Sequence, residues 1–397
     1  MNKKIRGVLV WLIATLFVVY SFCLNTAAAV FSAPIKASLH ATDFTVALAT
    51  GAFILGFACM QIPAGYLLDK FNARFVVSGG ILLLALGNTI ISFSDNLLIF
   101  SLSNFVQGLG ASFAFIAAAV LISQWFRAKS FPVLFGLTQT ISCISAGIIH
   151  YYFTLALEVY SWNDIYHVLA VFGFALFVLS ILIVKTPATY KRGRPLSLAK
   201  SLAVVLKNKQ LWLCTIAAAA SFGVLLAYAS FWYAPIQQFY QVANTQAVIV
   251  SGMIFFGIGI GTPLLGYLSN RAKSRVKIIH LSLVLGTMAL LLGIYLPHYD
   301  IQTLAIIKVV SFLIGFLLSG SMLFYTIASE LSKDNTRGVA ISMVNTAVFL
   351  VNTLLLFLPY IFVTVFSTQF FTNLWILPIC ILFAVLLVSF VKDTYSK

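Results

Sequence analysis

A short charged turn separates two long apolar runs early in the chain, with the sequence Gly65-Tyr66-Leu67-Leu68-Asp69-Lys70-Phe71-Asn72-Ala73-Arg74. Residues 52–62 before it and residues 75–93 after it are mainly apolar. Two apolar spans joined by so few residues run antiparallel and turn back at one face of a membrane. Within the turn, an Asp and two basic residues can pair locally or reach the free backbone groups of a helix end.

A second copy of this turn lies 201 residues further on, at Gly266-Tyr267-Leu268-Ser269-Asn270-Arg271. It repeats the Gly-Tyr-Leu triplet and the basic end, with Asn270 in the place of Asp69. The charge bias of cytoplasmic loops alone would explain one such turn. The repetition predicts that both turns belong to a duplicated structural unit.

The composition excludes a water-soluble globule. Of the 397 residues, 61% are hydrophobic and only 8% are charged, and the mean hydropathy is +1.05. Soluble domains carry about 25% charged residues. Apolar runs of about 20 residues indicate transmembrane helices, and the alternating segments of a membrane β-barrel are not seen. The sequence predicts an all-α polytopic membrane protein.

Charge and cysteine placement exclude several kinds of partner. The formal net charge is +15, but the basic residues are scattered over short loops, so we expect no nucleic-acid partner. All five cysteines fall inside apolar spans without a CxxC or Cys/His cluster, namely Cys23, Cys59, Cys143, Cys214 and Cys380. We therefore expect small packing residues rather than a disulfide, a metal site or a cofactor.

Hydropathy predicts twelve transmembrane helices, six on each side of a polar segment. Their ranges are 7–33, 44–68, 75–93, 97–123, 130–156, 163–184, 211–236, 245–270, 278–296, 303–329, 337–366 and 370–391. This organisation gives a six-helix bundle over 1–184, a cytoplasmic loop over 185–210 and a second six-helix bundle over 211–397. Within the loop, residues 197–206 form either an amphipathic helix on the inner membrane surface or a plain linker.

The first apolar run admits two interpretations. It follows a basic start, and Ala27-Ala28-Ala29 resembles a signal-peptidase site. The run is long for the core of a signal peptide, however, and its removal would break the repeat. We expect it to be the first helix.

The basic residues set the topology. Of the 24 lysines and arginines, all except Lys36 and Lys308 fall in segments that are cytoplasmic if the N-terminus is inside. This distribution follows the positive-inside rule and places both termini in the cytoplasm. Short loops and the absence of an N-x-S/T sequon favour a bacterial inner membrane.

The two halves repeat beyond the charged turns. At an offset of 201, Thr50-Gly51 corresponds to Ser251-Gly252 and Gly56 to Gly257; at 206, Ser123-Gln124 corresponds to Ser329-Glu330 and Gln139-Thr140 to Asn345-Thr346. Two repeated six-helix halves are typical of secondary transporters, whose substrate site lies between the halves.

The first turn resembles the signature G-x-L-x-D-R-x-G-R of the major facilitator superfamily. Asp69, Lys70 and Arg74 match in kind, while Asn72 stands where a Gly is usual. The resemblance implies the twelve-helix fold in two pseudo-symmetric bundles and transport by alternating access. It also implies a gating role for the two turns, carried by Gly65, Asp69, Lys70, Arg74, Gly266, Asn270 and Arg271.

Two departures weigh against a drug/proton antiporter of this superfamily. Where such exporters carry R-x-x-Q-G-x-G in the fourth helix, this chain has Asn104 in place of the Arg. Their fifth-helix Gly-Pro motif is missing, because residues 136–147 contain no proline. By contrast, the stretch 123–127, Ser-Gln-Trp-Phe-Arg, resembles the loop of branches that carry organic anions.

Polar residues inside spans are candidates for substrate contact, because a polar group in lipid is costly unless it pairs or lines a cavity. In the resembled fold the first, fourth, seventh and tenth helices line the cavity. The candidates there are Tyr20, Asn25, Thr26, Asn104, Gln107, Tyr228, Trp232, Gln237, Lys308 and Tyr325, and the fifth and eleventh helices add Gln139, His150, Asn345 and Asn352.

Each candidate has a structural alternative. Amide side chains often only bond a neighbouring helix, and Tyr or Trp near span ends anchor at the interface. Lys308 and Lys36 can extend outward to the membrane surface. His150 is either a satisfied core histidine or a proton carrier.

Acidic residues are absent from the middle of every predicted span. A cation exporter needs a buried carboxylate, so their absence favours a neutral or anionic solute, with Lys308 or Lys36 as the countercharge. We expect a monomeric secondary transporter in the lipid bilayer that takes up a small organic solute, coupled to a proton or a sodium ion. The alternative is an exporter of metabolites or drugs. A membrane enzyme would need clustered catalytic residues, and none are found.

Overall fold

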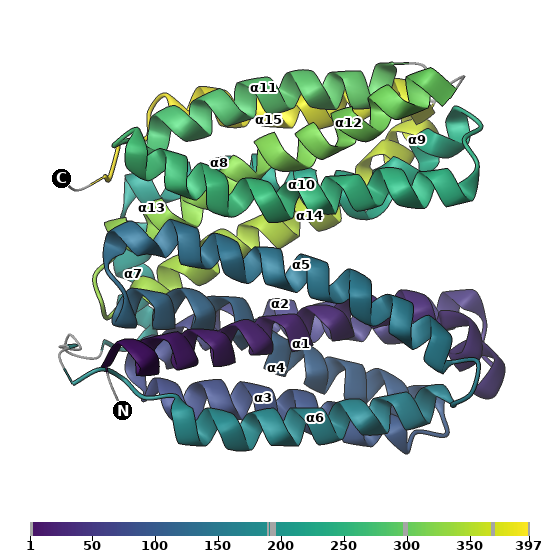
Figure 1. The fold of residues 1–397 in the computed structure, drawn as a ribbon, viewed down its shortest axis with the longest axis horizontal. Helices are drawn as coiled ribbons and strands as arrows, with labels where there is room; N and C mark the ends of the chain where they lie inside the picture. Colours follow the sequence, from purple (N-terminus) through teal and green to yellow (C-terminus); the bar gives the residue numbers. More distant parts are fainter. Residues whose placement is uncertain (1–2, 189, 191–195, 297–300, 367–369, 396–397) are drawn as a thin grey trace. The chain divides into compact units, whose positions relative to one another are not determined.

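The computed structural model of the chain describes all residues except 1–2, 189, 191–195, 297–300, 367–369 and 396–397 (Figure 1). All regular elements among the described residues are helical, which confirms the predicted fold class. The helices are α1 (Lys3–Ser38), α2 (Asp43–Lys70), α3 (Ala73–Ser92), α4 (Leu97–Trp125), α5 (Phe131–Ala156), α6 (Trp162–Ile183), α7 (Leu198–Leu206), α8 (Lys209–Ala227), α9 (Tyr233–Phe239), α10 (Asn244–Arg271), α11 (Arg275–Tyr295), α12 (Ile301–Leu318), α13 (Leu323–Leu331), α14 (Arg337–Phe366) and α15 (Ile376–Val388).

Eleven helical segments of the described chain are long and apolar enough to cross a membrane, and a shorter apolar helix lies over Asn373–Val388. Three of the predicted spans are built from more than one element. A π-helical turn, Tyr228–Trp232, joins α8 to α9, and a 3-10 turn, Ser319–Met322, joins α12 to α13. In the span 370–391, a 3-10 turn, Phe370–Trp375, precedes α15. The loop between the repeats contains α7, so its residues 198–206 are helical rather than an extended linker.

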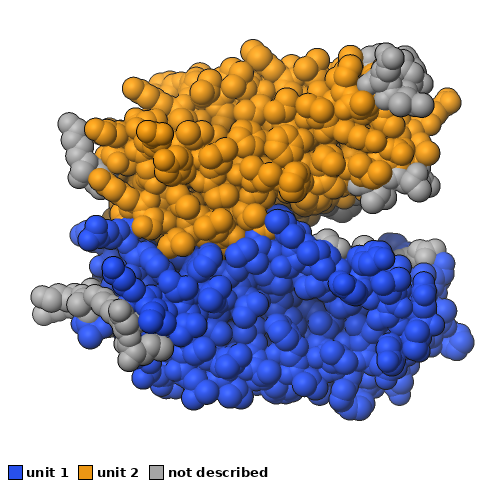
Figure 2. Space-filling model, viewed as in Figure 1, with its two compact units in different colours: residues 1–127, 141–202, 333–342 blue, residues 128–140, 203–332, 343–397 orange. Residues whose placement is uncertain are grey.

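The chain forms two compact units, coloured separately in Figure 2. Unit 1 contains residues 1–127, 141–202 and 333–342; unit 2 contains residues 128–140, 203–332 and 343–397. Three helices, α5, α7 and α14, therefore contribute to both units. The first part of α5 belongs to unit 2 and the remainder to unit 1, whereas α14 begins in unit 1 and continues in unit 2.

The two units pack their helices in equivalent pairs. In unit 1, α4 contacts α2 and α3, and α3 also lies beside α6 (Figure 1). In unit 2, α12 contacts α10 and α11 in the same way. The internal repeat seen in the sequence is therefore a repeat of helix packing.

Reciprocal glycines set the closest of these helix crossings. A Cβ at Gly56 of α2 would overlap the carbonyl oxygen of Phe105, and a Cβ at Gly108 of α4 would overlap that of Phe53. Small residues allow such backbone contact between membrane helices.

Unit 2 repeats this arrangement. Gly257 of α10 lies against the Phe312 carbonyl, and Gly315 of α12 lies against the Ile254 carbonyl. Gly257 is the counterpart of Gly56 at the offset of 201. The same pair of backbone contacts therefore positions the charged turn that follows α2 and the one that follows α10.

Candidate functional site

Asp69, in the last turn of α2, hydrogen-bonds the start of α14. Its side chain is 4% exposed, and its two carboxylate oxygens accept from the main-chain N–H groups of Gly338, at 2.7 Å, and Val339, at 3.0 Å. The first N–H groups of a helix have no partner within the helix and carry partial positive charge. A carboxylate therefore stabilises this helix start.

Gly65 makes this contact possible, one helical turn before Asp69. A Cβ at Gly65 would overlap the Gly338 carbonyl, and a Cβ at Gly338 would overlap the Gly65 carbonyl. Because neither position has room for a side chain, the two backbones come close enough for Asp69 to reach the amides.

The remaining residues of the first turn bind within unit 1. Asn72 is the N-cap of α3, and its Oδ1 accepts from Arg74 N at 3.0 Å, which explains an Asn where the family signature has a Gly. Arg74 Nε donates to the Val184 carbonyl at the end of α6, at 3.1 Å. The Lys70 amine lies 5.3 Å from the Tyr66 ring centroid.

The second turn meets the start of α5 with a different chemistry. Gly266 packs against the backbone of Pro132, as Gly65 packs against Gly338. Proline has no N–H group, so this position cannot donate as Gly338 does. Instead the Asn270 side chain donates from Nδ2 to the Lys129 carbonyl at 2.7 Å.

Arg275 is the buried centre of the second turn, with 1% of its surface exposed. Its guanidinium donates to Asn270 Oδ1 and Ser269 Oγ, both at 2.7 Å. It also forms an ion pair with Glu330 at 3.1 Å. A buried cation of this kind requires such partners.

The sequence analysis missed Arg275 and named Arg271, whose side chain is exposed. The repeat offset contained the missing signal. At 201 residues, Arg74 corresponds to Arg275, and Lys70 corresponds to Arg271.

The C-terminal segment completes this cluster. Asp393 accepts from the Ser274 hydroxyl and from Arg275 N at 3.2 Å, so it caps the start of α11. Burial alone would raise the pKa of the Asp393 carboxyl, but the Ser274 hydroxyl and three main-chain N–H groups outweigh it and lower the pKa below its ordinary value. The Tyr395 ring lies 5.1 Å from Arg275 Cζ and 5.8 Å from Lys129 Nζ.

The intramembrane candidates of unit 1 form an internal network. The Tyr20 hydroxyl donates to the Leu169 carbonyl at 2.8 Å and accepts from Asn88 Nδ2, and Gln107 Nε2 donates to Asn88 Oδ1 at 2.7 Å. The structure thus joins Tyr20 and Gln107 through Asn88, which the sequence analysis missed. An Asn in the middle of the apolar span 75–93 was the available signal. Asn104 bonds the Phe100 carbonyl of its own helix at 2.8 Å.

Three further candidates lie elsewhere in unit 1. Asn25 of α1 is exposed, and the side chain of Thr26 lies outside the described part of the chain. His150 of α5 is half-buried and hydrogen-bonds the backbone of Cys23. His150 of α5 and Cys23 of α1 are thus in contact within unit 1.

In unit 2, Tyr325 and Asn345 are brought together. The Tyr325 hydroxyl donates to Asn345 Oδ1 at 2.9 Å, and the Phe135 ring lies 5.7 Å from the Tyr325 ring. Trp232, in the π-helical turn, donates from Nε1 to the Leu355 carbonyl at 2.9 Å. Tyr325 and Asn345 thus form one pair, and Trp232 binds α14 separately.

The other candidates of unit 2 differ in burial. Gln139, Tyr228 and Gln237 are buried, and the Tyr228 hydroxyl lies beside Gly293 of α11. Asn352 Oδ1 is buried and has no hydrogen-bond partner among the described residues. Lys308 of α12 is half-buried and forms no ion pair with any described residue.

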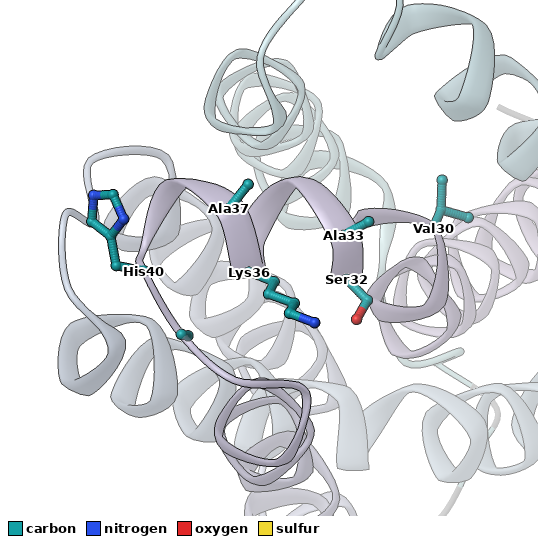
Figure 3. Close-up of a pocket in the computed structure, with 7 residues that line it drawn as sticks. Val30, Ser32, Ala33, Lys36, Ala37 and His40 are labelled. Carbon is teal, nitrogen blue, oxygen red and sulfur yellow. The ribbon is translucent and has the colours of Figure 1, made fainter.

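An open depression lies at the end of α1 and the turn that follows it, with a volume of about 550 Å³ (Figure 3). It is lined by Val30, Ser32, Ala33, Lys36, Ala37, His40 and Ala41. The Lys36 amine and the Ser32 hydroxyl point to one side, and the His40 ring points away from them (Figure 3). The structure thus places the predicted outer lysine in an open surface depression.

Two helical units with duplicated packing and duplicated charged turns define a polytopic membrane transporter. The chain belongs to the Major Facilitator Superfamily, whose family model matches residues 13–356. This finding confirms the resemblance carried by the first turn.

Solved structures of the superfamily share the whole fold. The proton:xylose symporter XylE, bound to 6-bromo-6-deoxy-D-glucose, has a TM-score of 0.77 at 13% identity, covering 100% of this chain and 98% of that one. The Escherichia coli fucose:proton symporter FucP has a TM-score of 0.75 at 16% identity, covering 99% and 100%. Identities this low establish the fold alone.

Sequence relatives match over a shorter range. Multidrug resistance protein MdtL of Escherichia coli O45:K1 is 26% identical over 155 residues, which is 38% of this chain and 39% of the relative. MdtL of Shigella dysenteriae serotype 1 is 25% identical over the same length. The aligned part of the chain thus spans about two fifths of the length of these relatives.

Proposed function

We propose that this superfamily transporter is a secondary active transporter that takes up a small polar organic solute, anionic or neutral, by alternating access. The observation that carries the proposal is the bond between Asp69 and the start of α14. This helix begins in unit 1 and has most of its length in unit 2.

The two hydrogen bonds of Asp69 are strong enough to stabilise one conformational state of the transporter. A hydrogen bond to a charged group contributes about 1.5–3 kcal/mol, and the helix dipole adds to the attraction. Two such bonds at a buried site stabilise the state in which the first turn of α14 is docked. Alternating access then requires that these bonds break and re-form in each cycle.

The solute class follows from charge. The predicted spans hold no carboxylate near their middle, and half-buried Lys308 has no ionic partner among the described residues. An anionic group of the solute would supply that partner. XylE and FucP are sugar symporters coupled to protons, which supports a neutral solute and proton coupling as well.

Export by proton antiport is the second candidate, because the curated relatives are multidrug resistance proteins. Asn104, where the antiporter pattern has an Arg, and the proline-free stretch 136–147 weigh against it. In either case the proposed location is the bacterial inner membrane, with a monomer whose termini are cytoplasmic.

The test uses purified protein in two stages. A thermal-shift screen against organic anions, amino acids and sugars identifies a solute, and proteoliposomes with imposed proton or sodium gradients then establish direction and coupling. Accumulation against a gradient from outside supports uptake, whereas accumulation only in inside-out vesicles contradicts it.

Lys308→Gln tests the proposed countercharge, and Lys36→Gln, at the surface depression, tests the alternative one. We expect Lys308→Gln alone to abolish binding of an anionic solute. Unchanged solute affinity in purified Lys308→Gln would remove Lys308 from the site.

A further inference from the structure

A patch on unit 2 combines exposed lysines with exposed apolar side chains where two membrane helices end. Its residues are Leu206, Lys207, Lys209, Trp212, Phe390 and Lys392, called here the basic patch. The apolar members are strongly exposed, with 47% for Leu206, 41% for Trp212 and 62% for Phe390. The three lysines are exposed as well.

Hydrogen bonds hold the two segments of the basic patch side by side. Gln210 donates from Nε2 to the Phe390 carbonyl at 3.3 Å and accepts at Oε1 from Lys392 N at 2.8 Å. Trp212 Nε1 donates to the Leu206 carbonyl at 2.8 Å, which ties the indole to the turn between α7 and α8. The patch is therefore a built surface rather than a chance overlap of loops.

The basic patch has a purely positive charge. Residues 197–212 contain no acidic residue. The nearest acid along the chain, Asp393, is committed to the start of α11 by its bonds to Ser274 and Arg275. The ammonium groups of Lys207 and Lys209 thus have no carboxylate in their own segment, and the carboxylate that follows Lys392 is hydrogen-bonded to the start of α11.

The position of the basic patch at the ends of two membrane helices indicates which kind of molecule it contacts. Lys209 begins the membrane span of α8, and Phe390 follows the short apolar helix α15. The distribution of lysines and arginines places these ends on the cytoplasmic side. Aromatic side chains at span ends lie at the level of lipid headgroups, and lysine amines there reach the phosphates.

We propose that the basic patch binds the headgroup of an anionic phospholipid in the cytoplasmic leaflet. The ammonium groups of Lys207, Lys209 and Lys392 bind the phosphate, and the rings of Trp212 and Phe390 contact the glycerol and the first part of the acyl chains. The exposed apolar area commits the patch to a lipid rather than to a soluble phosphate, because a soluble anion would leave that area in water.

The test measures lipid binding to the full-length protein without reference to transport. Native mass spectrometry and thermal-shift titration compare phosphatidylglycerol with phosphatidylcholine. We expect a clear preference for phosphatidylglycerol, and a loss of about tenfold to a hundredfold in its affinity in the variant Lys207→Gln/Lys209→Gln/Lys392→Gln. The matched control is Lys185→Gln/Lys277→Gln/Lys333→Gln, which removes three other exposed lysines.

Each outcome either supports or contradicts lipid binding at the basic patch. Equal losses in the two triple variants would show general charge attraction and overturn the site, as would unchanged binding in the patch variant. Displacement of the lipid by glycerol phosphate at equal concentration would overturn the commitment to a lipid. Brominated phosphatidylglycerol gives an independent readout, since we expect it to quench tryptophan fluorescence less in Trp212→Phe.

Discussion

The two charged turns occupy equivalent places in the repeat but carry their acid at different positions. The first turn has Asp69 and, at the end of α4, the neutral Gln124. The second turn has the neutral Asn270 and, 206 residues after Gln124, the acidic Glu330. The acid of the first turn binds main-chain amides of α14, whereas Glu330 pairs with the Arg275 side chain.

The helix that each turn meets explains the difference. The start of α14 offers the N–H groups of Gly338 and Val339, so a carboxylate is the matching side chain. The start of α5 presents Pro132, and only a donor such as the Asn270 amide can bond the neighbouring Lys129 carbonyl. The chemistry of the turn is therefore set by the backbone of its partner.

The largest expected effect is on the buried ion pair of the second turn. Arg275→Met leaves Glu330 without its cation, and we expect a loss of about 3–5 kcal/mol in the free energy of unfolding. Thermal unfolding in detergent measures it, with Arg271→Met as the exposed control. The double variant Arg275→Met/Glu330→Met should recover part of the loss; a double variant no better than Arg275→Met would mean that the pair is not the cause.

Asp69→Asn breaks the first turn without disturbing the second. The neutral side chain loses the charge that both α14 amides bind, so we expect transport in proteoliposomes to slow about tenfold with solute affinity kept. Asp95→Asn, at an exposed position between α3 and α4, should have no effect. A transport rate like that of the unmodified protein would show that the contact does not limit the cycle.

Asn270→Asp makes the second turn resemble the first and should change transport by less than about threefold. The new carboxylate bonds Arg275 more strongly but loses the donation to the Lys129 carbonyl, and the two changes offset one another. The measurement is the same proteoliposome assay. A loss as large as that of Asp69→Asn would contradict the asymmetry of the turns.

The smallest effect concerns pH and belongs to the second turn alone. Because the native pKa of Asp393 is lowered, its stabilising contribution is complete above the ordinary Asp pKa of about 3.9 and is lost as pH falls through the native value. Asp393→Asn should therefore flatten the decline of thermal stability below about pH 4. An identical decline in Asp393→Asn and in the unmodified protein would show that the Asp393 carboxylate does not contribute to this pH dependence.

The fold was predictable from sequence because a lipid bilayer allows only a few kinds of membrane-spanning backbone structure. Apolar run length predicted twelve spans, and the described chain contains eleven long apolar helices and a shorter one over Asn373–Val388. The duplicated Gly-Tyr-Leu turns pointed to the superfamily. The hydrogen-bond network inside unit 1 could not be predicted from the sequence in the same way. Asn88 joins Tyr20 to Gln107 only because α3 packs against α1 and α4, and no spacing along the chain reveals that packing.

The second turn shows the same limit in a milder form. The repeat offset identifies Arg275 as the counterpart of Arg74, yet its burial against Glu330 and Tyr395 depends on the C-terminal segment folding back. The sequence also does not show why the second turn has Asn270 in the place of an Asp, because this depends on the packing of Pro132 against Gly266. Sequence reasoning found the residues of the turns but not the partners that give them their roles.

The reciprocal glycines of α2 with α4 and of α10 with α12 have a consequence for how the two repeats can diverge. Main-chain atoms touch main-chain atoms at these crossings, so the distance between the helix axes does not depend on the size of any side chain. Neighbouring side chains are then free to differ between the repeats without moving the helices apart. Two halves with few residues in common can thus keep the same helix packing.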